Sequence, residues 1–112
     1  MINKDFFKKI RILDGGMGQE LLARGMKPNS TLWSANAILD ANYHQLVLDT
    51  HVDFIKAGAE VIVTTTFATR QKRLKENSLL DKFEYLNQKA GEIAQAAKQN
   101  FPNTYIAGGI PP

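Results

Sequence analysis

The chain has 112 residues, of which 44% are hydrophobic and 22% charged, the composition of an ordinary globular domain. The absence of cysteine excludes disulfides and thiolate metal ligands within the chain. No apolar run approaches the roughly 20 residues that span a bilayer, and the N-terminus lacks the apolar core of a signal peptide. A formal charge of +3, spread along the chain, is weak evidence for nucleic acid. We expect one cytoplasmic domain, or part of a larger one, over residues 1–112, with neither a nucleic acid nor a membrane as partner.

The first expected strand, residues 10–14, follows a short helix at residues 5–9 whose Phe6 and Phe7 are expected to pack under it. The strand leads into the motif Asp14-Gly15-Gly16-Met17-Gly18, and a helix is expected from Gln19 to Arg24. Glycines let the backbone turn sharply and approach a ligand. A carboxylate at the end of such a strand lies where parallel α/β folds build their sites.

The rest of the chain alternates between expected helices and strands. We expect a helix at residues 42–57, a buried strand at 60–66, a helix at 79–99 and a third strand at 104–108. The last helix carries an apolar stripe of Phe83, Leu86, Ala90, Ile93 and Ala97. The order fits an open doubly wound sheet or the N-terminal part of a (β/α)8 barrel. Three strands in 112 residues is close to the number of strands that such a barrel has over this length of sequence.

Three motifs together resemble the homocysteine S-methyltransferase family. They are residues 12–21 (ILDGGMGQEL), residues 32–35 (LWSA) and residues 57–67 (AGAEVIVTTTF), and the closing residues 107–111 (AGGIP) are similar to the family's third-strand motif. The resemblance implies the N-terminal part of a (β/α)8 barrel, with about three parallel strands and their helices. It also implies transfer of a methyl group from a small donor to the thiol of homocysteine, giving methionine.

The resemblance implies roles in substrate binding for several residues. Asp14 is expected near the amino group of homocysteine, where a carboxylate forms a charge-assisted hydrogen bond with an ammonium; the alternative is a helix cap or turn residue. Gly15 and Gly16 are expected to present backbone N–H groups to the substrate carboxylate, or only to form the turn. The remaining expected contacts are Trp33, Ser34 and Thr66, with Trp33 equally compatible with core packing.

The resemblance implies zinc as the cofactor, held by three cysteines in the later part of the barrel and therefore outside this chain. His44 and His51 are seven residues apart, not the four of a helical zinc pair, so we expect them to face solvent or to be structural. No catalytic residue and no metal ligand is expected in this chain.

The sequence leaves the methyl donor open between S-methylmethionine, S-adenosylmethionine, betaine and a methylated folate. Thr65, Ala68, Gly109 and Pro111 depart from the family's commoner residues. The basic cluster of Arg70, Lys72, Arg73 and Lys75 is expected to be a solvated helix face, with attraction of an anionic donor as the alternative. The alternative function is a non-catalytic half-barrel that dimerises or docks on a partner through its open sheet edges.

Overall fold

The computed structural model describes residues 2–111; Met1 and Pro112, the ends of the expected domain, lie outside the described part. The helices are α1 (Met17–Ala23), α2 (Asn36–Leu39), α3 (His44–Lys56), α4 (Gln71–Glu76) and α5 (Phe83–Lys98), and the strands are β1 (Val61–Val63) and β2 (Tyr105–Ala107). Short 3-10 helices occur at η1 (Lys4–Lys8), η2 (Trp33–Ala35), η3 (Ala41–Tyr43) and η4 (Leu80–Lys82). The expected helices and the last two of the three expected strands are observed. None of the helices between residues 2 and 111 is long and apolar enough to cross a membrane.

The sheet confirms parallel pairing but contains fewer strands than expected. β1 and β2 pair in parallel, with Ile62 opposite Ile106. The expected first strand at residues 10–14 is reduced to one parallel bridge between Leu13 and Val61. The Asp14 N–H still donates to the Val61 carbonyl at 3.1 Å, but the next ladder donor, Val63 N–H, bonds to Oδ2 of the Asp14 side chain at 2.9 Å. A carboxylate thus takes the place of a strand carbonyl, and regular pairing ends there.

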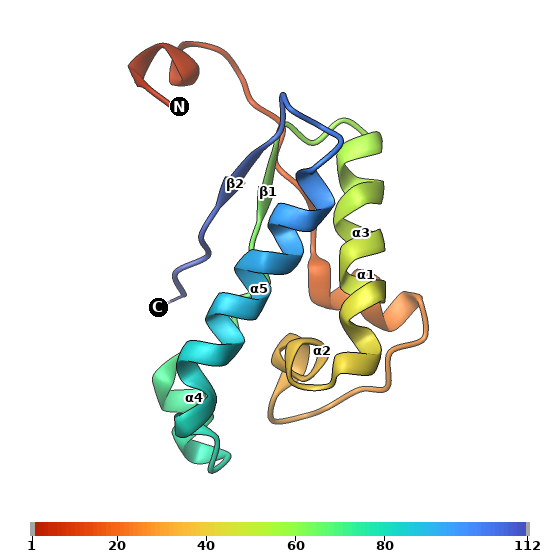
Figure 1. Cartoon of the computed structure of the whole chain (residues 1–112), viewed down its shortest axis with the longest axis vertical. Helices are drawn as coiled ribbons and strands as arrows, with labels where there is room; N and C mark the ends of the chain where they lie inside the picture. The colour runs from red at the N-terminus through yellow and green to blue at the C-terminus, as the bar shows by residue number, and fades with distance from the viewer. Residues whose placement is uncertain (1, 112) are drawn as a thin grey trace.

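Helices α3 and α5 pack side by side against one face of the two strands (Figure 1). Their contact with the sheet is a small apolar cluster of Ile55, Ala59, Ile62, Ala94 and Ala97, with Ile106 packed against it. In α5 the buried residues are Leu86, Ala90, Ile93, Ala94 and Ala97. The apolar stripe predicted for this helix is therefore confirmed, with Phe83 only partly buried at its start.

A second cluster joins the helices around the carboxyl end of β1. Its fully buried members include Leu21 of α1, Val47 of α3, Leu74 of α4 and Leu86 of α5. Because each helix contributes one apolar face, the cluster fixes α1 and α4 relative to the strand end. This packing holds the loops that follow Asp14 and Val63 in place.

The N-terminal helix η1 places only one of its two phenylalanines against the sheet. Phe6 is buried, and its ring centroid lies 4.9 Å from that of Tyr105, the first residue of β2. Phe7 is 73% exposed, so the expectation that it packs under the first strand is wrong. A 3-10 helix has three residues per turn, so neighbouring side chains point in different directions and only one faces the sheet.

Candidate ligand-binding site at the carboxyl end of the sheet

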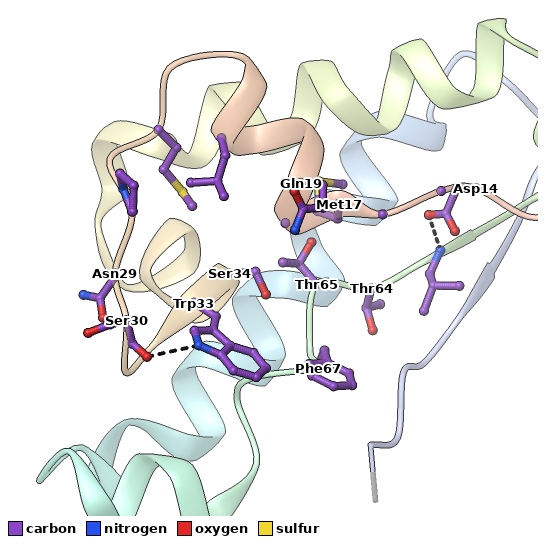
Figure 2. A pocket seen from close by; sticks show the side chains of 17 residues that line it. Asp14, Met17, Gln19, Asn29, Ser30, Trp33, Ser34, Thr64, Thr65 and Phe67 are labelled. Atoms are coloured by element: carbon purple, nitrogen blue, oxygen red, sulfur yellow. Dashed lines mark hydrogen bonds between the residues drawn. The ribbon is translucent and has the colours of Figure 1, made fainter.

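A cavity of about 630 Å³ lies where β1 ends, between the start of α1, the loop before η2 and residues 63–67 (Figure 2). Five of the six residues expected to bind substrate line it: Asp14, Gly15, Gly16, Trp33 and Ser34. Sites of parallel α/β folds occur at this end of their strands. The structure therefore brings together residues that are up to 20 positions apart in the first third of the sequence.

Asp14 is anchored to the neighbouring strand and not to the glycine turn. Gly16 is the N-cap residue of α1, and no side chain caps the helix there. Asp14 instead accepts the Val63 N–H through Oδ2, as the dashed line in Figure 2 shows. Burial raises the pKa of this carboxyl above its ordinary value, and the backbone N–H groups of Val63 and of Asp14 itself oppose that rise. The capping alternative is not the observed geometry.

Trp33 forms a half-exposed wall of the cavity and does not belong to the core. Its backbone φ is +50°, and its indole Nε1–H donates to the Ser30 carbonyl at 3.1 Å. The ring stacks on that of Phe67, with centroids 6.1 Å apart and planes 7° from parallel. The Arg73 guanidinium lies 4.1 Å from the Trp33 ring centroid and donates to the Thr31 carbonyl at 2.8 Å. The sequence did not single out Phe67 as a site residue, because its pairing with Trp33 exists only in the folded chain.

The three consecutive threonines after β1 have different roles. Thr66 donates its hydroxyl to the Gly109 carbonyl at 2.7 Å and does not line the cavity. Thr64 accepts the Gly109 N–H at 3.2 Å and lies 3.0 Å from the Thr66 hydroxyl. Thr65 lines the cavity, is 5% exposed, and its hydroxyl has no hydrogen-bond partner among the described residues. Thr66, which we expected to bind substrate, thus fixes the loop after β2, and Thr65 faces the cavity in its place.

The histidines do not form a metal site with any other described side chain. No group of three or more His, Cys, Asp or Glu residues that could hold a metal ion occurs between residues 2 and 111. His51 is fully buried on α3, and burial lowers the pKa of its imidazole to about 4. His44 Nε2 lies 2.7 Å from the Ile38 carbonyl oxygen. Both histidines are thus structural, which is one of the two positions expected for them.

The basic cluster after β1 divides into two kinds of residue. Lys72 and Lys75 are exposed, as expected of a solvated helix face. Arg73 is only half-exposed, because it packs over Trp33 and bonds to the Thr31 carbonyl. Neither Arg70 nor Arg73 lines the cavity. One member of the cluster therefore supports a cavity wall from outside.

Comparisons with known proteins agree with this geometry. Residues 11–112 match the family model described as homocysteine S-methyltransferase. Homocysteine S-methyltransferase 2 of Saccharomyces cerevisiae is 30% identical over 94% of this chain and 35% of its own length. Homocysteine S-methyltransferase 2 of Zea mays is 34% identical over 89% of this chain and 29% of its own length.

The fold agrees with a solved structure of the same kind. The metallated form of the homocysteine methyltransferase MmuM from Escherichia coli superimposes with a TM-score of 0.80 at 27% identity, covering 97% of this chain and 41% of that one. The chain thus spans about a third of the length of the curated relatives it matches. It belongs to the homocysteine S-methyltransferase family.

Proposed function

We propose that this chain is the N-terminal part of a (β/α)8 barrel that transfers a methyl group from a small donor to the thiol of homocysteine, giving methionine. The observation that carries the proposal is the cavity at the carboxyl end of β1, with Asp14 as the only charged residue among the described residues that line it. The family match and the E. coli structure support the same reading. Within this site the chain supplies substrate binding, and the proposal assigns it no catalytic residue.

The Asp14 carboxylate is suited to hold the substrate ammonium. Its pKa is raised because burial removes water from the charged form. An ammonium beside it would restore the lost favourable interaction through a charge-assisted hydrogen bond to Oδ1. The bond from Val63 N–H to Oδ2 fixes the carboxylate at the same time. Gly15 and Gly16 belong to the same wall, and we propose that their N–H groups meet the substrate carboxylate.

The residues of this chain do not fit the zinc site that the family resemblance implies. The chain has no cysteine, and the described His, Asp and Glu side chains form no cluster of three. We therefore propose that the zinc ligands lie outside this chain. The 112-residue chain should lose zinc on dialysis; stoichiometric retention, measured by atomic emission, would contradict this placement.

The proposed activity is tested with the complete product of the gene. The protein is incubated with L-homocysteine and, in separate reactions, with S-methylmethionine, S-adenosylmethionine, betaine or a methylated folate, and methionine is measured by mass spectrometry. We expect methionine with at least one donor, with cysteine as a control acceptor that lacks one methylene. Failure to form methionine with all four donors would overturn the proposed activity.

The exposed sheet edge favours a second candidate, a non-catalytic module that pairs with another copy of itself. Ile12 and Leu13 are 57% and 58% exposed beside the single bridge to β1. An edge strand with unpaired backbone groups is a template for pairing with another chain. Light scattering over a concentration series distinguishes the candidates: a stable dimer without methionine formation supports the module, and a monomer excludes self-pairing.

A further inference from the structure

We propose that Thr65 is a substrate-binding residue whose hydroxyl donates a hydrogen bond to the α-carboxylate of homocysteine. The inference deepens the proposed function and rests on it, because it concerns the same cavity. It assigns the second charged group on the α-carbon, next to the ammonium that Asp14 would hold.

The first observation is the unpaired hydroxyl of Thr65. Thr65 is 5% exposed, and Oγ1 has no hydrogen-bond partner among the described residues. An unsatisfied buried polar group destabilises the folded state, because it has lost its hydrogen bonds to water. Buried hydroxyls are nearly always bonded, so one that is not requires an explanation. The neighbouring Thr66 shows the ordinary case, since its hydroxyl donates to the Gly109 carbonyl at 2.7 Å.

The second observation is where the hydroxyl points. Thr65 lines the cavity, and in Figure 2 its hydroxyl points toward the carboxamide of Gln19 on α1. Ser34 also lines the cavity and lies against the same helix, with its Cβ 3.7 Å from the position that a Cβ on Gly18 would take. Gln19 is exposed, so rotation of its side chain gives a ligand access to the Thr65 hydroxyl.

The chemistry of these three groups determines which part of the substrate they suit. Hydroxyl and carboxamide groups are neutral and can each donate a hydrogen bond. Asp14, the charged lining residue, suits the ammonium and would repel a carboxylate placed directly on it. The α-carboxylate of homocysteine therefore fits the neutral donors, together with the N–H groups of Gly15 and Gly16 in the same cavity. Hydrogen bonds to a charged group are stronger than those between neutral groups.

The test compares Thr65→Val with wild type in the complete gene product, using three thiols in binding titrations. L-Homocysteine has both charged groups, 3-aminopropane-1-thiol lacks the carboxylate, and 4-sulfanylbutanoate lacks the ammonium. We expect Thr65→Val to weaken homocysteine and 4-sulfanylbutanoate about tenfold, the loss of one hydrogen bond to a charged group. Binding of 3-aminopropane-1-thiol should be unchanged. Thr65→Ser keeps the hydroxyl and should keep homocysteine affinity within about twofold.

Thermal unfolding separates this role from a structural one. Thr65→Val removes an unsatisfied group without changing shape, so the melting temperature should stay constant or rise. Thr66→Val is the matched control, because it removes a hydroxyl bonded to Gly109 and should lower the melting temperature. Wild-type homocysteine affinity in Thr65→Val, or equal weakening of all three thiols, would overturn the inference for Thr65. If Asp14→Asn weakens homocysteine and Thr65→Val does not, the proposed function stands and this inference falls; no homocysteine binding by the wild-type protein would overturn both.

Discussion

The two ends of the small sheet are built from the same strands but use their side chains differently. At the amino end, Arg11 lies over the ring of Phe6 at 4.1 Å, donates from Nε to the Phe6 carbonyl at 2.8 Å and approaches Glu60 at 3.7 Å. At the carboxyl end, the Thr65 hydroxyl is unpaired, and Asp14 uses Oδ2 for one strand N–H. At the amino end the charged side chains contact one another, although Glu60 Oε2 makes no hydrogen bond among the described residues, whereas at the carboxyl end Asp14 and the unpaired Thr65 hydroxyl line a cavity.

This difference matches the general division of labour in parallel α/β folds, where one end of the strands serves stability and the other carries the site. An unpaired polar group is nevertheless insufficient evidence for a site. Both ring nitrogens of His51 are also unpaired, yet His51 lies on the same face of α3 as Val47 and Ile55, away from the cavity. A site requires that the unpaired group line a cavity, as Thr65 does.

The largest effect is expected at Asp14, the charged group of the carboxyl end. In the complete gene product, Asp14→Asn should reduce homocysteine affinity by about 2–5 kcal/mol, because the bound ammonium loses its counter-charge. Titration calorimetry with homocysteine measures this loss. Asparagine retains an oxygen that can accept the Val63 N–H, so the fold should remain intact. Unchanged homocysteine affinity in Asp14→Asn would end the ligand role of this residue.

Asp14→Asn is expected to affect homocysteine affinity and the stability of the fold differently. The folded state raises the pKa of Asp14, so its ionised form is disfavoured by folding, and the stability it contributes falls as pH rises through the folded pKa. Asp14→Asn removes that cost and should not lower the melting temperature at pH 7. Asp14→Ala leaves the Val63 N–H without its acceptor and should destabilise the fold by roughly 1–3 kcal/mol.

His51 should make the fold sensitive to acid without affecting the site. Its pKa is lowered from 6.5 to about 4 by burial, so the folded state disfavours the protonated imidazole. The stability is fully present above pH 6.5 and is lost as pH falls toward 4, by at most about 3–4 kcal/mol. Urea unfolding at pH 7, 5.5 and 4.5 gives the free energy of unfolding at each pH, and the slope of this free energy against pH measures the loss.

Substitution of His51 by Leu or by Gln removes the titrating group. Both variants should show a smaller loss of stability between pH 7 and pH 4.5 than wild type, while homocysteine affinity at pH 7 is unchanged. Slopes equal to that of wild type in both variants would show that other groups cause the acid sensitivity. A loss of homocysteine affinity would contradict the separation of His51 from the cavity.

Gly109 tests the part of the carboxyl end that serves stability. A Cβ at Gly109 would lie 3.0 Å from Thr66 Oγ1 and 3.3 Å from Val63 Cγ1, whereas one at Gly108 would meet nothing within 4 Å. Because Thr66 is bonded to the Gly109 carbonyl, it cannot move away freely. Gly109→Ala should therefore destabilise the fold by about 1–2 kcal/mol in urea unfolding. Gly108→Ala is the matched control, and equal effects of the two substitutions would contradict this packing.

The sequence predicted those features that depend on local pattern. The apolar stripe of α5 follows from spacing along the chain and is observed, and Asp14 lies directly after the single bridge between Leu13 and Val61. The strand at residues 10–14 was overpredicted because strand length depends on neighbours, and Asp14 itself replaces the next ladder acceptor. Neither the apolar stripe of α5 nor the motif at Asp14 indicates the methyl donor.

The roles of the threonines could not be predicted, because three identical residues in a row carry no internal distinction. Their roles follow from the turn at which Thr66 N–H bonds to the Thr64 carbonyl at 2.8 Å, which directs Thr66 toward Gly109 and leaves Thr65 on the cavity side. Likewise, Trp33 and Phe67 are 34 positions apart and meet only through the fold. Sequence reasoning therefore named five residues that line the cavity but not Thr65 and Phe67, which line it as well.

The smallest expected effect concerns Arg73, which supports the aromatic wall from outside the cavity. Its guanidinium lies 4.1 Å from the Trp33 ring centroid. Such a contact at a half-exposed site is worth about 0.5–1 kcal/mol. Arg73→Met should thus change the unfolding free energy by about 1 kcal/mol or less, but it should shift the fluorescence of Trp33, the single tryptophan of the chain.

The fluorescence change identifies what Arg73 does. Lys72→Met, a neighbouring exposed cation on α4, is the matched control and should leave the emission spectrum of Trp33 as in wild type. Arg73→Met removes both the cation over the indole and the bond to the Thr31 carbonyl, so Trp33 should become more mobile and more accessible to the quencher acrylamide. Equal quenching in wild type and Arg73→Met would show that Phe67 and the Ser30 carbonyl suffice to hold Trp33 in place. The position of Trp33 would then depend on Phe67 and the Ser30 carbonyl, and α4 would not contribute to it.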